Sequence, residues 1–177
     1  MASLPDQAQA AEGAHACLIT AQEHLQAAQS LSEHTLWGMA IAHLILSLEE
    51  AVKARVLGAV WLHHKTGWPL GFTPAQVRSL VTRSHKKRHG LAFLQALSMD
   101  DSTAIMLFGQ SPSETGVELL EWLSQADELK QQGMYTDQTD IGWQRPGLLP
   151  QSEYERAASF VEPFVRDTRQ QQRIAGL

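Results

Sequence analysis

The chain has 177 residues, of which 44% are hydrophobic and 19% charged, with a formal net charge of −5. This length fits one domain covering residues 1–177. The single cysteine, Cys17, excludes an internal disulfide and a paired-cysteine metal site. The first residues lack the basic and apolar regions of a signal peptide, and the longest apolar run, 36–48, is too short for a membrane span. We therefore expect a cytoplasmic protein with no membrane partner.

Apolar residues recur at three- and four-residue spacing along most of the chain, which is typical of helices. The spacing predicts helices over 6 to about 31 and over 33 to about 64. The second has the broadest apolar stripe, so we expect it to be central. After breaks at Gly67, Pro69 and Gly71, a capping box at Thr73–Gln76 predicts a helix that runs to about 98, where a connector over 99–110 begins.

Two further capping boxes, Ser111–Glu114 and Ser152–Glu155, predict the start of two more helices. The first should end with Gly133 in the C′ position, and the second near Arg173. Residues 134–150 between them are rich in turn residues, and no alternating pattern of strand length is present. The predicted fold class is all-α, a helical bundle of about five helices.

Charge is strongly segregated along the chain. Residues 53–99 contain no acidic side chain and carry a formal +8, whereas the remainder carries −13. The basic residues of this stretch are Lys53, Arg55, Lys65, Arg78, Arg83, Lys86, Lys87 and Arg88. This segregation indicates an anion site, with phosphate as the leading candidate; the alternative is a solvated helix face.

The first group of candidate residues lies on the predicted central helix. Glu49 and Lys53 are four residues apart in the favourable order, so we expect them to pair, with Glu50 beside them. As a surface ion pair they would contribute only a few tenths of a kcal/mol. Charge on so apolar a helix is costly unless paired, which favours a functional interpretation of all three residues as catalytic.

The second group is the run from Arg83 to His89. His85 and His89 are four residues apart and share a helix face. Histidine suits proton transfer near neutral pH, and basic side chains suit phosphate binding, which together allow RNA cleavage without a metal. We interpret His85, His89 and Arg83 as catalytic candidates, and the others as substrate-binding: Lys86, Lys87 and Arg88. A nonspecific basic patch is the alternative.

The third group, Lys130, Tyr135 and Asp137, follows a predicted helix and is a candidate for substrate binding. The alternative is a capped helix end with Tyr135 as a packing anchor. Only Glu12 and His15 match the Glu-x-x-His spacing of di-metal bundles, and no nucleotide-binding motif is present. We therefore predict no metal site and no cofactor.

Three segments in this order resemble the AbiV-like abortive-infection family, a group of bacterial phage-defence proteins similar to the wider HEPN group of helical RNases. They are Ser47–Ala54, His85–Lys87 and Lys130–Asp137. Val52 stands where the family usually has glycine. HEPN RNases use an Arg-x4–6-His spacing that Arg83 and His89 meet, whereas the AbiV-like segment points to His85, so both histidines remain candidates.

The resemblance implies a bacterial antiphage abortive-infection effector, a homodimer with sites from both subunits facing one cleft. It would act as a metal-independent endoribonuclease, block translation and respond to a phage-encoded activator protein. The alternative is a non-catalytic HEPN-like interaction module that binds a phage protein or a host translation component. A third interpretation is nucleic-acid binding without turnover.

Overall fold

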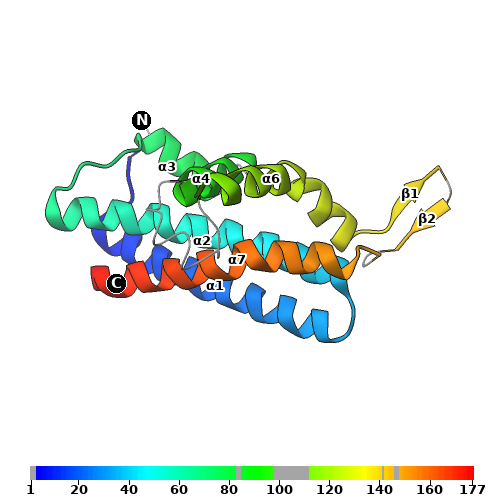
Figure 1. Ribbon diagram of the computed structural model, residues 1–177. Helices are drawn as coiled ribbons and strands as arrows, with labels where there is room; N and C mark the ends of the chain where they lie inside the picture. The colour runs from blue at the N-terminus through cyan, green and yellow to red at the C-terminus, as the bar shows by residue number, and fades with distance from the viewer. Residues whose placement is uncertain (1–2, 83–84, 98–111, 141, 146–147) are drawn as a thin grey trace.

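The computed structural model describes residues 3–82, 85–97, 112–140, 142–145 and 148–177. Its elements in chain order are α1 (Gln7–Glu33), α2 (Trp37–Thr66), α3 (Pro74–Thr82), α4 (His85–Leu97), α6 (Pro112–Met134), β1 (Asp137–Thr139), β2 (Gly142–Gln144) and α7 (Gln151–Ala175). Figure 1 shows an elongated bundle in which the long helices run side by side. The predicted all-α helical bundle is confirmed, with six helices in the described part of the chain.

The second helix is the centre of the bundle, as its sequence predicts. α2 contacts α1, α3, α4, α6 and α7, so every other described helix packs on it. It is apolar on most sides over its middle turns, and residues such as Ile41, Leu44, Val52 and Val56 are fully buried. A helix that is hydrophobic nearly all round is stable only when covered on several faces.

α1 packs closely along α2 because its buried face consists mostly of alanines. The buried alanines are Ala10, Ala14, Ala21 and Ala28. These small side chains let the two backbones approach, and the Ser47 hydroxyl donates across the contact to the carbonyl oxygen of Ala21 at 2.7 Å. At its start, α1 is capped by Asp6, which accepts from the backbone N–H of Gln9 at 2.9 Å.

The region predicted as one helix from Thr73 to about 98 is two helices, α3 and α4. The capping box is present, because the backbone N–H of Thr73 donates to Gln76 Oε1 at 2.8 Å. The prediction of one helix was wrong, since α3 ends at Thr82 and α4 begins at His85; the sequence between them, 83–84, lies outside the described residues and contains no proline or glycine to indicate a break. The connector 99–110 and Ser111 also lie outside them.

The predicted ends of the last two helices also need correction. Gly133 is not in a C′ position but is buried inside α6, where an added Cβ would lie 2.1 Å from the carbonyl oxygen of Gly38. The glycine is therefore required by the close crossing of α6 and α2. Ser152 does not cap α7, because this helix begins at Gln151 after Pro150, which makes no side-chain capping hydrogen bond.

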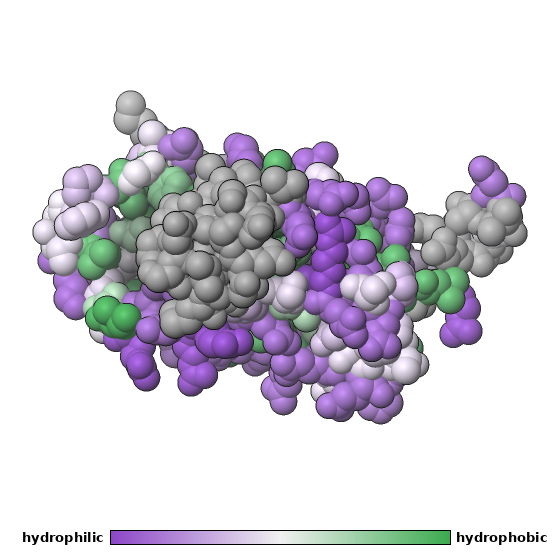
Figure 2. Space-filling view, in the orientation of Figure 1, coloured by the Kyte–Doolittle hydropathy of each residue, from purple (hydrophilic) through white to green (hydrophobic). Residues whose placement is uncertain are grey.

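A short hairpin that the sequence pattern did not predict joins α6 to α7. β1 and β2 pair antiparallel, with Gln138 opposite Trp143, and the hairpin projects beyond one end of the bundle (Figure 1). Strands of three residues are too short to give a detectable alternation. Among the described residues, no helix has both the length and the apolar character to cross a membrane. The described surface on the face in Figure 2 is mostly hydrophilic.

Candidate functional site

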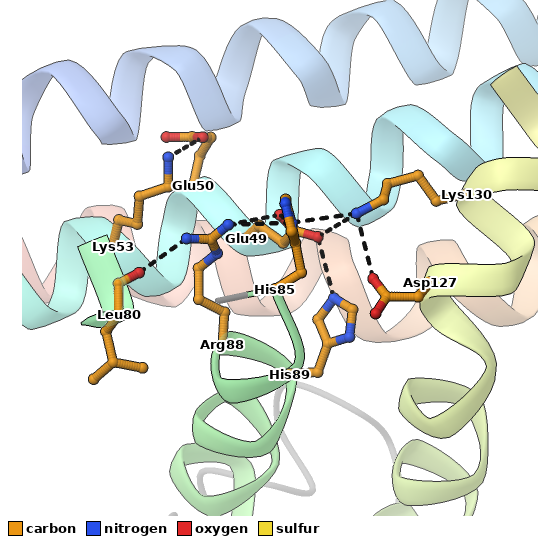
Figure 3. A network of polar contacts seen from close by, with 9 residues as sticks. All are labelled: Glu49, Glu50, Lys53, Leu80, His85, Arg88, His89, Asp127 and Lys130. Atoms are coloured by element: carbon orange, nitrogen blue, oxygen red, sulfur yellow. Dashed lines mark hydrogen bonds and ion pairs between the residues drawn. The ribbon is translucent and has the colours of Figure 1, made fainter. Parts of the chain in front are cut away.

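The candidate site is organised around Glu49, a carboxylate whose side chain is only 2% exposed. Glu49 leaves α2 toward α4 and α6, and four side chains converge on it (Figure 3). His85 Nδ1 and Arg88 Nη2 contact Oε2, the latter at 3.3 Å. His89 Nε2 lies 3.3 Å from Oε1, and Lys130 Nζ donates to Oε1 at 2.8 Å.

The spacing of residues on α4 explains this convergence. His85, Arg88 and His89 are at positions i, i+3 and i+4, which share one face of a helix. Arg88 is buried and also donates from Nη1 to the carbonyl oxygen of Leu80 at 2.9 Å, so it ties α3 to the cluster. Lys130 reaches the same carboxylate from α6. One carboxylate on α2 thus fixes the positions of α4 and α6.

Glu49 is ionised in the folded protein. Burial alone would raise its pKa, but hydrogen bonds from His89, Lys130 and His85 and the charge of Lys130 hold the pKa of this carboxyl well below its usual range. The contacts with these three residues therefore outweigh the cost of desolvation. Because an ionised carboxylate only accepts hydrogen bonds, each ring nitrogen that contacts it must carry a proton.

This requirement sets the tautomer of His85. Its Nδ1 contacts Glu49 Oε2 and also lies 3.1 Å from Arg88 Nη2 and 3.3 Å from Lys130 Nζ. The proton on Nδ1 points at the carboxylate, so Nδ1 cannot also accept hydrogen bonds from the two cations. Arg88 and Lys130 therefore donate to Glu49. The proton on Nδ1 leaves Nε2 as the basic nitrogen. The His85 side chain is 51% exposed, unlike its partners in the cluster.

A surface pocket of about 460 Å³ adjoins the cluster between α4 and α6. Its lining residues are Lys86, His89, Gly90, Leu120, Leu123, Ser124, Asp127 and Glu128. His89 belongs to both the pocket and the Glu49 cluster, and so joins the buried charges to an accessible space. The exposed part of its wall offers a cation from Lys86, an apolar surface from Leu120 and a hydrogen-bond acceptor from Glu128.

Asp127 belongs to the site although the sequence did not single it out. Its Oδ1 lies 3.5 Å from Lys130 Nζ, one helical turn away on α6. Glu49, His89 and Asp127 bring one ligand atom each within 4.8 Å of one another, a donor set that suits a transition metal. The Lys130 ammonium already contacts two of the three, so an ion at that position would have to displace it.

A family comparison identifies the group to which the chain is related. The family model HEPN_AbiV, described as AbiV, matches residues 9–161. The chain belongs to the AbiV family. Neither the comparison with curated proteins nor that with solved structures gave a match.

The three segments that resemble the AbiV family meet in space. Glu49 comes from the first segment, His85 from the second and Lys130 from the third, and all three side chains are in one cluster (Figure 3). The segments are far apart in the chain and lie on three different helices, α2, α4 and α6. Their common point in this AbiV-family protein is a single buried carboxylate.

Glu50 and Lys53 lie on the other side of α2, facing α1 (Figure 3). The predicted ion pair between Glu49 and Lys53 was wrong, because Lys53 Nζ contacts Glu50 Oε1 instead. Adjacent residues on a helix point about 100° apart, and Glu49 turns toward the four donors of α4 and α6.

Burial, followed by the charge of Glu50, raises the pKa of the half-buried Cys17 thiol to about 11.

The remaining candidates are dispersed. Lys86 lines the pocket, whereas Lys87 Nζ donates to Ser79 Oγ at 3.0 Å and so faces α3. Tyr135 is exposed just after α6, and the described contacts do not connect its side chain to the cluster. Arg83 lies outside the described residues, as does the side chain of Asp137, which begins β1.

Proposed function

We propose that this AbiV-family protein is an antiphage abortive-infection effector that cleaves RNA at the Glu49 cluster without a metal ion. The observation that carries this proposal is the half-exposed imidazole of His85, held by a buried, ionised carboxylate beside a pocket. A carboxylate that orients a histidine and stabilises its protonated form is a recurring arrangement for proton transfer. Membership of the AbiV family supports the role in abortive infection.

In the proposed reaction, Nε2 of His85 takes the proton of a ribose 2′-hydroxyl. The 2′-oxygen then attacks the adjacent phosphorus, and the bond to the 5′-oxygen of the next nucleotide breaks. The 5′-oxygen takes up a proton from an acid in the site, for which His89 is our candidate. The products are one fragment with a 2′,3′-cyclic phosphate and one with a 5′-hydroxyl.

Charge at the phosphate would be stabilised by the cations around the cluster. Lys130 lies 2.8 Å from Glu49 and at the side of His85, so it can interact with a phosphoryl oxygen near the attacking base. Lys86 at the pocket wall is placed to hold the neighbouring phosphate. Arg88 is buried and bonded to Leu80 and Glu49, so we assign it a positioning role.

The setting of the reaction is part of the same proposal. We place the protein in the cytoplasm, where it would act as a homodimer and be activated by a phage-encoded protein. RNA cleavage would then block translation in the infected cell. Light scattering on the purified protein measures the oligomeric state, and a monomer at micromolar concentration would remove the dimer from the proposal.

The test is incubation of the purified protein with total RNA in the presence of EDTA. We expect fragments with 2′,3′-cyclic ends from the parent protein and a loss of at least 100-fold for His85→Ala, as for removal of a general base. His15→Ala is the matched control, since His15 is an exposed histidine on α1. Intact RNA with the parent protein, or equal cleavage by His85→Ala, would contradict the proposal.

A second candidate function is a non-catalytic interaction module. It is favoured by the burial of Arg88 and His89 and by the four contacts to Glu49, which is also how a structural ion cluster locks helices together. For this function we expect His85→Ala to protect cells against phage as well as the parent does. The protein would then be recovered from infected cells in a stable complex with a phage protein or a translation component.

A further inference from the structure

A second cluster of histidines lies at the contact between α1 and α2, away from the Glu49 cluster. His24 Nδ1 is 3.1 Å from His43 Nδ1, and the ring centroids are 5.2 Å apart with the planes inclined at 53°. Both side chains are half-buried. Nothing in the proposed nuclease mechanism uses this pair, which therefore needs a separate explanation.

We propose that His24 and His43 form a binding site for a divalent transition metal ion, coordinated by the two Nδ1 atoms. At a metal–nitrogen distance of about 2.05 Å, two nitrogens 3.1 Å apart subtend an angle of about 98° at the ion. This lies between the roughly 90° of square-planar copper and the roughly 109° of tetrahedral zinc. The ring nitrogens are therefore already at chelating distance, and the rings would rotate so that both nitrogens point at the ion.

The two rings are hydrogen-bonded to each other through their Nδ1 atoms. A metal ion binds the neutral imidazole through a ring nitrogen that carries no proton. In the apo protein one Nδ1 donates its proton to the other, and binding requires that proton to move to Nε2 of the same ring.

The charged groups along the same contact do not compete with the site. Glu50 lies seven residues after His43 on α2, and Cys17 lies seven residues before His24 on α1. Because the two helices are antiparallel, both residues are two helical turns from the histidine pair in the same direction. Glu50 is bonded to Lys53, which offsets its charge. The half-exposed rings leave the other coordination positions to water, which makes this an open site rather than a closed structural one.

The ion would link two helices that are adjacent in sequence and packed along their length. Because the unfolded chain does not hold the two imidazoles together, binding would stabilise the folded protein. Copper should bind more tightly than zinc or nickel, following the usual order for imidazole ligands. The site is independent of the proposed nuclease function, and its test does not rely on RNA cleavage.

The test is a calorimetric titration of chelator-treated protein with ZnCl2, together with electron paramagnetic resonance after addition of one equivalent of CuSO4. We expect one equivalent of metal, an increase in Tm, and a copper spectrum with hyperfine coupling to two imidazole nitrogens. His24→Gln and His43→Gln should each weaken binding at least tenfold and remove one nitrogen coupling. His15→Gln, an exposed histidine on the same helix, should bind as the parent does.

Two results would overturn this proposal. One is equal affinity in the parent, His24→Gln and His43→Gln. The other is a metal equivalent that is lost in Asp127→Asn and retained in the two histidine variants, since that would place the ion at the Glu49, His89 and Asp127 donor set. The copper spectrum keeps the test decisive if a variant is less stable, because nitrogen coupling is measured on the parent protein itself.

Discussion

The charge of Glu49 should contribute more to folding than that of any exposed carboxylate in the chain. Glu49→Gln keeps the shape of the side chain but removes the charge that Arg88 and Lys130 face in a buried setting. Removing one partner of a buried ion pair typically costs about 3–5 kcal/mol, because the remaining charge is left uncompensated. For a protein of this size, that corresponds to a decrease in Tm of roughly 10 °C.

Glu50→Gln is the matched control, since it changes the adjacent carboxylate in the same helix. Glu50 pairs with Lys53, and both side chains are nearly one-fifth exposed. A pair of this kind should contribute about 1 kcal/mol or less. Both variants replace a glutamate by glutamine, so the difference in their free energies of unfolding measures the effect of the surroundings of the charge.

The assay is urea unfolding followed by circular dichroism at pH 7, with the free energy of unfolding extrapolated to water. We expect Glu49→Gln to lose several kcal/mol relative to Glu50→Gln, with similar slopes of free energy against urea concentration. Equal stabilities for the two variants would refute the reasoning, because they would mean that the charges around Glu49 are solvated in solution.

Three other predictions follow from the same contacts. Because the pKa of Glu49 is depressed in the folded protein, its ionisation should contribute stability above its ordinary pKa of about 4.5, and this stability should be lost as the pH falls further. Between pH 6 and pH 3 the urea midpoint should therefore fall less in Glu49→Gln than in the parent protein. Gly133→Ala should destabilise by about 2 kcal/mol or more, because its Cβ would meet the Gly38 carbonyl oxygen. Gly90→Ala, where the space is open, should change stability by about 1 kcal/mol or less in the same melt. His85→Ala should lower Tm by only a few degrees while abolishing RNA cleavage, and a large loss of stability would contradict the separation of these roles.

Much of the cluster could be predicted because helical spacing determines which residues share a face. His85 and His89 were expected on one face of a helix, and the structure places them there, with Arg88, around one carboxylate. The partner of Lys53 could not be predicted in the same way. Spacing gives the angle between neighbouring side chains on α2, but which face is covered by α1 and which by α4 depends on tertiary packing.

Asp127 and the helix ends were missed for related reasons. Asp127 precedes Lys130 by one turn, but such pairs are common on exposed helices, so only the burial of Lys130 distinguishes this one. Gly133 looked like a helix terminator because glycine commonly ends helices. Its actual role is steric, since it faces Gly38 at a helix crossing. Local sequence signals do not contain that contact, which joins residues almost a hundred positions apart.

The charges of the cluster show which of its residues can be removed without leaving a buried charge unpaired. Arg88 and Lys130 bring two basic groups to a buried carboxylate, and Asp127 lies beside Lys130. These groups already satisfy Glu49 electrostatically, so a further donor is not needed to compensate its burial. His85 and His89 are further donors, and of the two His85 has half of its side chain in solvent. Because its removal would leave no buried charge unpaired, activity lost in His85→Ala can be attributed to the imidazole itself, whereas loss in an Arg88 variant cannot.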